Sequence, residues 1–192
     1  MAYKSITFTK VRLENDWLSN MAPYGIKSDD LDCRTAEAFF QALRFPKGSS
    51  ERRRVSMETN PMSAKKLAKS MQPEMNVVQL SLTDVLIMRY TIGLKLIQNP
   101  ELYDKLQQLD EDQYIMEDVT NRGLSTSRSD LFWGSAKVGL NEYSESHWVG
   151  VNTLGNIWDD YRDMLSEVDY ARGGVEHTVS QLKVVLTGLG VI

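Results

Sequence analysis

The chain has 192 residues, of which 42% are hydrophobic and 25% are charged, and its formal net charge is −4 at pH 7. These proportions argue against a disordered chain, and no apolar run approaches the roughly 20 residues that cross a bilayer, which argues against a membrane protein. The negative charge also disfavours non-specific nucleic-acid binding. No stretch rich in Pro, Gly or Ser divides the chain, so residues 1–192 are expected to form a single compact domain.

Metal-binding and disulfide-forming residues are scarce. Cys33 is the only cysteine, and His147 and His177 are the only histidines. An intrachain disulfide and a multi-cysteine zinc site are therefore excluded, and we expect no metal or cofactor. Cys33 is expected to be a buried residue rather than a nucleophile. The first ten residues lack the apolar core of a signal peptide, so we expect a cytoplasmic protein.

The N-terminal third predicts a strand, a loop and a helix. Residues 6–12 alternate and are rich in β-branched side chains, which predicts a short strand. Residues 17–32 carry Asn, Pro, Gly and several Asp residues, which indicates an irregular loop long enough to be functional. Thr35 can cap a helix that runs through Phe45 and is ended by Pro46.

Polar side chains share one face of this expected helix. Glu37 and Gln41 are four residues apart and therefore lie on the same side. The apolar residues Phe39 and Leu43 lie partly on another side. Glu37 and Gln41 are thus free either to line a pocket or to face water.

The strongest helical pattern covers residues 82–98, where apolar residues recur in steps of three or four and Asn99-Pro100 ends the run. Lys95 lies beside the apolar stripe that includes Met88. A lysine in that position either extends to the surface or lies in a pocket with a lowered pKa.

The remaining pattern is mostly helical, and the fold class expected is α+β, predominantly α-helical, with a few short strands. A buried strand over residues 114–119 would deliver Glu117. The other expected elements are helices at about 49–58, 62–71, 100–109, 154–166 and 175–186, and a turn at Gly173 and Gly174.

Basic residues cluster between positions 52 and 69, opposed there by few acidic ones. Such a cluster either faces a phosphate or forms a solvated helical face, which is the commoner case. Its members are Arg52, Arg53, Arg54, Lys65, Lys66 and Lys69.

Two short motifs combine groups that suit a small aromatic ligand. Asp130 precedes the pair Trp133-Gly134 by three residues, and a Gly-x-Asn-x-x-Gly turn spans residues 150–155 around Asn152. Together they supply a carboxylate, a stacking surface and close backbone approach. A core tryptophan and a plain helix-start turn would explain the same residues.

Common catalytic motifs are absent from the sequence. It contains no Gly-x-Ser-x-Gly elbow, no phosphate-binding P-loop and no His-Glu-x-x-His motif. The absence of these motifs therefore disfavours a serine hydrolase, a nucleotide kinase and a metalloprotease.

The order of motifs resembles the NADAR family, also called the YbiA-like family, whose members act on N-glycosidic bonds of ribose derivatives. The matches run in order over residues 18–165, with Ala38 where the family usually has His and Arg44 where it usually has Lys. They are Leu18-Ser-Asn20, Thr35 to Phe45, Asn60-Pro-Met-Ser-Ala-Lys65, Met88 to Leu96, Pro100-Glu-Leu102, Met116-Glu117, Asp130 to Gly134, Gly150 to Gly155 and Arg162.

This resemblance implies a set of site residues. Lys95 would be the nucleophile of an imine route, and Glu37, Glu117 and Asp130 would act as acid, base or electrostatic partners, because breaking a ribosyl C–N bond builds positive charge and needs a proton on the departing nitrogen. Trp133 would stack on the base. The remaining substrate-binding residues expected are Asn20, Gln41, Arg44, Gly134, Asn152 and Arg162.

The function expected from the resemblance is an N-glycosidase that hydrolyses a ribosylamine bond. The substrate would be either an ADP-ribosyl adduct on guanine or an early riboflavin-pathway intermediate, and the residues do not select between them. A non-catalytic binder of ADP-ribose or NAD-derived nucleotides is a second hypothesis, and an α-rich interaction domain without a ligand is a third.

Overall fold

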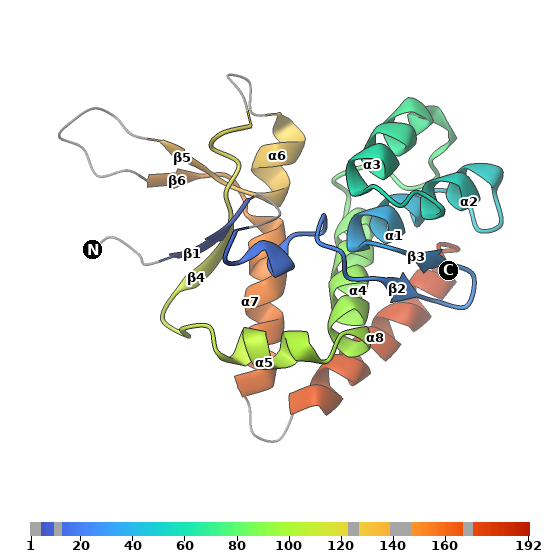
Figure 1. The fold of residues 1–192 in the computed structure, drawn as a ribbon. Helices are drawn as coiled ribbons and strands as arrows, with labels where there is room; N and C mark the ends of the chain where they lie inside the picture. Colours follow the sequence, from blue (N-terminus) through green and yellow to red (C-terminus); the bar gives the residue numbers. More distant parts are fainter. Residues whose placement is uncertain (1–4, 10–12, 123–126, 139–146, 167–170) are drawn as a thin grey trace.

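The computed structural model describes residues 5–9, 13–122, 127–138, 147–166 and 171–192. The fold is α+β and mostly helical, as the sequence predicts. In Figure 1, helices α1 to α4 and α8 form one side of the molecule, while α6, α7 and the strands β1, β4, β5 and β6 form the other.

The helices agree with the expected segments to within a few residues in most cases. Thr35 caps the first helix as predicted, because its hydroxyl accepts a hydrogen bond from the Ala38 amide at 3.2 Å. The helices are α1 (Ala36–Ala42), α2 (Ser50–Ser56), α3 (Pro61–Ser70), α4 (Leu82–Gln98), α5 (Glu101–Gln107), α6 (Arg128–Trp133), α7 (Thr153–Ser166) and α8 (Ala171–Gly188), with single 3-10 turns at Asp16–Leu18 and Gln72–Glu74.

The strands form three separate pairs within the described residues. Strand β1 (Ser5–Phe8) runs parallel to β4 (Tyr114–Glu117), with Phe8 opposite Glu117. The other two pairs are antiparallel: β2 (Ile26–Lys27) with β3 (Asp32–Cys33), and β5 (Ala136–Val138) with β6 (His147–Val149).

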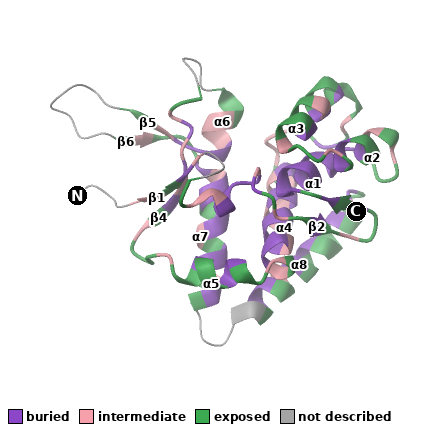
Figure 2. Ribbon diagram, in the orientation of Figure 1, coloured by how far each residue is buried: buried purple, intermediate pink, exposed green. Residues whose placement is uncertain are grey.

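Helix α4 lies at the centre of the core and packs against α1, α7 and α8 (Figure 2). Ile92, Lys95 and Trp158 are fully buried in this region, and Cys33 is buried as expected. Burial raises the pKa of the Cys33 thiol to about 12, which suits an inert core residue. Among the described residues, no helix combines the length and apolarity that a membrane span requires.

Several expectations about local structure are wrong. Gly173 and Gly174 lie inside α8 rather than in a turn, because Val175 and the apolar face that follows pack into the core and outweigh the low helix propensity of glycine. The segment 17–32 includes β2, and α6 was not expected at all. Residues 10–12 of the expected first strand lie outside the described part of the chain.

Candidate active site

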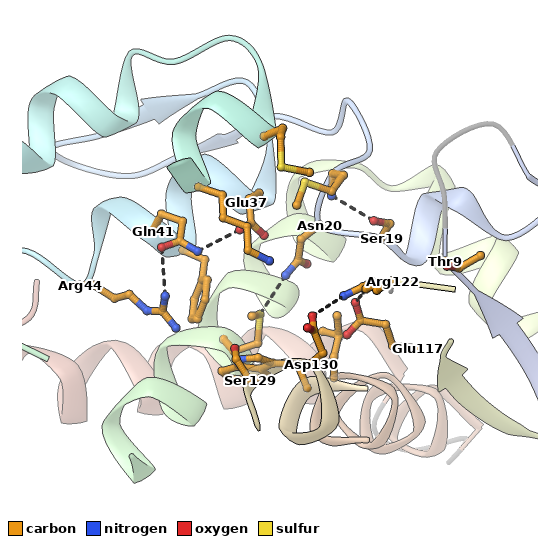
Figure 3. Close-up of a pocket in the computed structure, with 17 residues that line it drawn as sticks. Thr9, Ser19, Asn20, Glu37, Gln41, Arg44, Glu117, Arg122, Ser129 and Asp130 are labelled. Atoms are coloured by element: carbon orange, nitrogen blue, oxygen red, sulfur yellow. Dashed lines mark hydrogen bonds and ion pairs between the residues drawn. The ribbon is translucent and has the colours of Figure 1, made fainter. Parts of the chain in front are cut away.

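A pocket of about 230 Å³ opens between α1 and α3 on one side and β4 and α6 on the other (Figure 3). This volume is below the roughly 300–1,000 Å³ of pockets that enclose a drug-sized ligand, so the enclosed part of a bound ligand would be small. The seven expected site residues that line it are Asn20, Glu37, Gln41, Arg44, Glu117, Asp130 and Trp133.

Helix α1 contributes a chain of hydrogen bonds to one wall. Gln41 Nε2 donates to Glu37 Oε1 at 2.9 Å, and Arg44 Nη1 donates to Gln41 Oε1 at 3.0 Å. Because a guanidinium can only donate, it fixes the Gln41 amide with its NH₂ group toward Glu37. Glu37 is thus held in one orientation at the pocket.

The guanidinium of Arg44 forms an ion pair with a buried carboxylate. Its Nε and Nη2 donate to the two carboxylate oxygens of Asp84 at 2.8 and 2.7 Å, and Asp84 is fully buried. The Leu80 amide also donates to Asp84 at 2.8 Å. The guanidinium lies 4.2 Å from the centre of the Phe40 ring. We therefore infer that Arg44 orients Gln41 and does not make the substrate contact expected of it.

The opposite wall carries two carboxylates joined by an arginine that the sequence analysis did not single out. Arg122 Nη2 donates to Glu117 Oε1 at 2.6 Å, and Nη1 donates to Asp130 Oδ1 at 3.3 Å. Burial raises the pKa of Glu117, and the charge of Arg122 opposes that shift. Arg122 follows β4 in a turn, where no periodicity indicates a functional side chain.

Asp130 is also the third residue of a capping box that starts α6. Its Oδ2 accepts hydrogen bonds from the Ser127 amide at 3.2 Å and the Ser127 hydroxyl at 2.6 Å, while the Asp130 amide donates back to that hydroxyl. Although burial alone would raise it, the bonds from Ser127 and Arg122 bring the pKa of Asp130 below its usual value. Asp130 is thus an anion at neutral pH.

Two buried acceptors at the pocket accept no hydrogen bond from any described residue. They are Glu117 Oε2 and Asn20 Oδ1. The amide nitrogen of Asn20 contacts the Met88 sulfur at 3.2 Å. Buried polar atoms are rarely left without partners, so both oxygens mark positions where a ligand can donate a hydrogen bond.

Lys95 is not brought into the pocket with the carboxylates. Its side chain is fully buried, and its amine donates to the carbonyl oxygens of Trp17 at 2.5 Å and Ser19 at 3.0 Å. Burial lowers the pKa of Lys95 to about 7. Of the two alternatives that the sequence leaves open, the lowered pKa is found and extension to the surface is not. The amine binds the loop that precedes Asn20 and does not enter the pocket.

Asn152 also turns away from the pocket. Its Oδ1 accepts a hydrogen bond from the Glu117 amide at 3.0 Å, and its Nδ2 donates to the Ile115 carbonyl at 2.8 Å. Asn152 has a φ of 56°, a left-handed conformation that asparagine tolerates better than most residues. With one accepted and one donated hydrogen bond, the Asn152 side chain binds the backbone of β4 in the way that a neighbouring strand does.

Three glycines lie at close backbone approaches around this asparagine and β4. A Cβ at Gly155 would overlap the Asn152 side chain and the Ile115 carbonyl, and one at Gly134 would come within 2.5 Å of the Glu117 carbonyl. Gly150 has a φ of 142° and would overlap Gly134. The close approach at Gly134 and Gly155 is thus made to β4, and that at Gly150 is made to Gly134 and Ser135.

The two remaining expected residues have different positions. Trp133 lines the pocket but is 8% exposed, with its ring edge-to-face against Phe40 at 5.5 Å. Arg162 donates to the Gln113 carbonyl at 2.7 Å and pairs with Asp159 at 2.9 Å, away from the pocket lining. Arg162 therefore anchors the chain that enters β4.

Comparison with known proteins identifies the family. The model of the NADAR domain matches residues 7–166, which is most of the chain. The chain belongs to the NADAR family. The NMR structure of the Escherichia coli protein YbiA has a similar fold, with a TM-score of 0.65 and 23% identity over 86% of this chain and 87% of that chain. No curated protein matches the chain.

This NADAR chain departs from the family pattern at Ala38 and Arg44. Ala38, which stands where the family pattern has a histidine, belongs to the hydrophobic core and is fully buried. Arg44 keeps a positive charge beside Gln41. Lys65, which lies in a motif shared with the family, lines the pocket from α3 and is exposed. Among the described residues, no cluster of three or more His, Cys, Asp or Glu is suited to hold a metal ion.

Proposed function

We propose that this NADAR protein is an N-glycosidase that hydrolyses the C–N bond of a ribosylamine. The observation that carries the proposal is the presence of Glu37, Glu117 and Asp130 around one pocket of about 230 Å³. Cleavage of this bond builds positive charge on the anomeric carbon, which carboxylates stabilise, and it requires an acid for the departing nitrogen. Family membership supports the same class of reaction.

Glu117 is the best candidate for the general acid. Burial raises its pKa, and its Oε2 accepts no hydrogen bond from the described residues, so a proton on that oxygen can reach a ligand. Glu37, oriented by Gln41, is the candidate for stabilising the cation or activating water. Asn20 Oδ1 is available to accept a hydrogen bond from a ribose hydroxyl.

Hydrolysis by carboxylates and water needs no covalent lysine. The imine route through Lys95 would require its amine to leave the carbonyl oxygens of Trp17 and Ser19 and to enter the pocket. The buried position of that amine favours the direct route. Among the described residues that line the pocket, Lys65 is the cation left to face a phosphate of the substrate, because carboxylates bind Arg44 and Arg122.

Both substrates expected from the resemblance stay candidates, because each has an exocyclic amine as the leaving group. Purified protein should be incubated with ADP-ribosylated guanosine and with the ribosylaminopyrimidine of early riboflavin synthesis, and the released guanosine or aminopyrimidine measured by chromatography. We expect Glu117→Gln and Glu37→Gln to lower kcat by roughly 10²- to 10⁴-fold. Glu111→Gln, which alters an exposed acid, is the control and should retain native activity.

Three outcomes separate the hypotheses. Release of guanosine or of the aminopyrimidine that depends on Glu117 supports the glycosidase. Ligand-dependent thermal stabilisation without release of either product would replace it with a nucleotide binder. Borohydride reduction during turnover should trap no adduct on Lys95, and a peptide carrying such an adduct would restore the imine route.

A further inference from the structure

Arg122 is presented to the pocket by an ordered turn. Its amide donates to the Val119 carbonyl at 3.1 Å. Within the same turn, the Thr120 amide donates to Asp118 at 2.8 Å and the Thr120 hydroxyl accepts from the Lys137 amide of β5 at 2.7 Å. The turn that carries Arg122 is therefore held by the residues that directly follow β4 and by Lys137 of β5.

The guanidinium of Arg122 uses its two terminal nitrogens on two different carboxylates. Nη2 binds Glu117 Oε1 and Nη1 binds Asp130 Oδ1, and the exposed fractions of the three side chains are 31% for Arg122, 11% for Glu117 and 23% for Asp130. A planar fork with fixed geometry sets the spacing of the groups that it binds. Arg122 thus fixes the distance between β4 and α6 at the pocket (Figure 3).

The second oxygens of the two carboxylates differ. Asp130 Oδ2 is occupied by the amide and hydroxyl of Ser127. Glu117 Oε2 is buried and accepts no hydrogen bond from the part of the chain that the structure describes. By binding Oε1, Arg122 leaves Oε2 as the oxygen that can meet a ligand.

We propose that Arg122 is a positioning residue, which holds Glu117 and Asp130 together by one oxygen each and so determines that Glu117 Oε2 is the oxygen that delivers the proton to the leaving nitrogen. This inference rests on the proposed function, in which Glu117 is the general acid. In the reaction, the proton passes from Oε2 to the departing nitrogen as the C–N bond breaks. Water then adds to the anomeric carbon and gives up a proton to the Glu37 carboxylate, and Glu117 regains its proton from solvent.

The charges around Glu117 set the direction of the test. Arg122 and Lys65 favour the anionic carboxylate, whereas Glu37 on α1 and burial oppose it. Asp130, which shares Arg122, is an anion on α6. Burial raises the pKa of Glu117 and the charge of Arg122 lowers it. Removal of that charge should therefore raise the pKa of Glu117, so that it holds its proton to a higher pH.

The first experiment measures the titration of Glu117 without any substrate. Protein carrying ¹³C-labelled glutamate side chains is titrated by NMR, and Glu117→Gln identifies the signal. We expect the midpoint to rise by about one pH unit or more in Arg122→Met and in Arg122→Gln. Arg122→Lys keeps the charge and should titrate near the native midpoint. Arg128→Met, at an exposed arginine of α6, should leave the midpoint unchanged.

The second experiment uses the ribosylamine substrate. Arg122→Lys lacks the fork, so kcat should fall roughly 10- to 100-fold with little change in KM. In Arg122→Met the alkaline limb of the pH profile should move upward with Glu117. An unchanged Glu117 titration in both neutral variants would overturn the inference, whether or not the protein has activity. A shifted titration in a protein that hydrolyses neither ribosylamine would support the role of Arg122 and refute only the proposed function.

Discussion

The backbone amide of Glu117 donates a 3.0 Å hydrogen bond to the side chain of Asn152. The acid proposed for catalysis is therefore held through its main chain by the Gly-x-Asn-x-x-Gly motif, and through its side chain by Arg122. Along the chain, Arg122 precedes α6 and Asn152 follows it. The main chain of Glu117 and its carboxylate are thus held by different residues.

Replacing Asn152 with alanine should destabilise the protein. The change removes the partners of the Glu117 amide and the Ile115 carbonyl, and each unsatisfied buried group costs about 1–3 kcal/mol. Alanine is also less favourable than asparagine at a φ of 56°. Urea unfolding measures the loss. Asn156→Ala is the control, because that side chain is exposed and, among the described residues, donates one hydrogen bond, to the Val151 carbonyl. Equal losses in the two variants would contradict the prediction.

Replacing Arg44 with methionine should cost about 3–5 kcal/mol, because Asp84 would be left as a buried charge without its ion-pair partner. The same variant should lower activity, since Gln41 and Glu37 lose their orientation. Arg89→Met removes an exposed pair with Asp160 and should cost about 0–1 kcal/mol. Chemical denaturation of both variants tests the difference, and a similar cost for each would refute it.

Lys95 should make stability depend on pH. Its folded pKa of about 7 is below the ordinary value of 10.5, so between these values the unfolded chain binds more protons than the native state. Lys95 should therefore increase the free energy of unfolding as pH rises through this window, by up to about 1.4 kcal/mol per pH unit. Below pH 7 this contribution is absent.

Unfolding in urea at pH 7, 8 and 9 detects this dependence. Lys95→Met should show a smaller rise with pH than the native protein, whereas Lys66→Met, at an exposed lysine of α3, should show the native rise. Parallel curves for Lys95→Met and the native protein would mean that the amine is not desolvated.

Two glycine substitutions should have opposite effects. Gly155→Ala inserts a methyl group where the Asn152 side chain and the Ile115 carbonyl already lie, and should reduce the melting temperature strongly or prevent folding. Gly173→Ala meets no atom within 4 Å and lies in α8, so it should stabilise the protein by up to about 1 kcal/mol. Thermal denaturation distinguishes the two; a stable Gly155→Ala protein would show that the motif can move away from β4.

The helices were predictable because their apolar residues repeat regularly and because caps mark their ends. The segment 82–98 coincides with α4, and Thr35 caps α1 as expected. Prediction failed where tertiary contacts outweigh local preference, as at Gly173 and Gly174. Strands of two or three residues, such as β2, carry too little pattern to be recognised.

Much of the candidate site could also be anticipated, since Glu37, Glu117 and Asp130 all line one pocket. The direction of a side chain was harder to predict. Lys95 lies in the expected apolar stripe, but only the path of the chain around Ser19 shows what its amine meets. Arg122 gave no signal, because its role depends on a turn that brings it back over Glu117.

The parallel pairing of β1 with β4 has a consequence for folding. It joins Ser5 to Tyr114 and Phe8 to Glu117, so a long intervening chain must be brought together before the strand that carries the acid is complete. Closing such a loop is entropically costly and slow compared with forming helices. We expect a helical intermediate to collapse first and to be catalytically silent, so that the appearance of activity during refolding reports the last pairing and not the formation of the core.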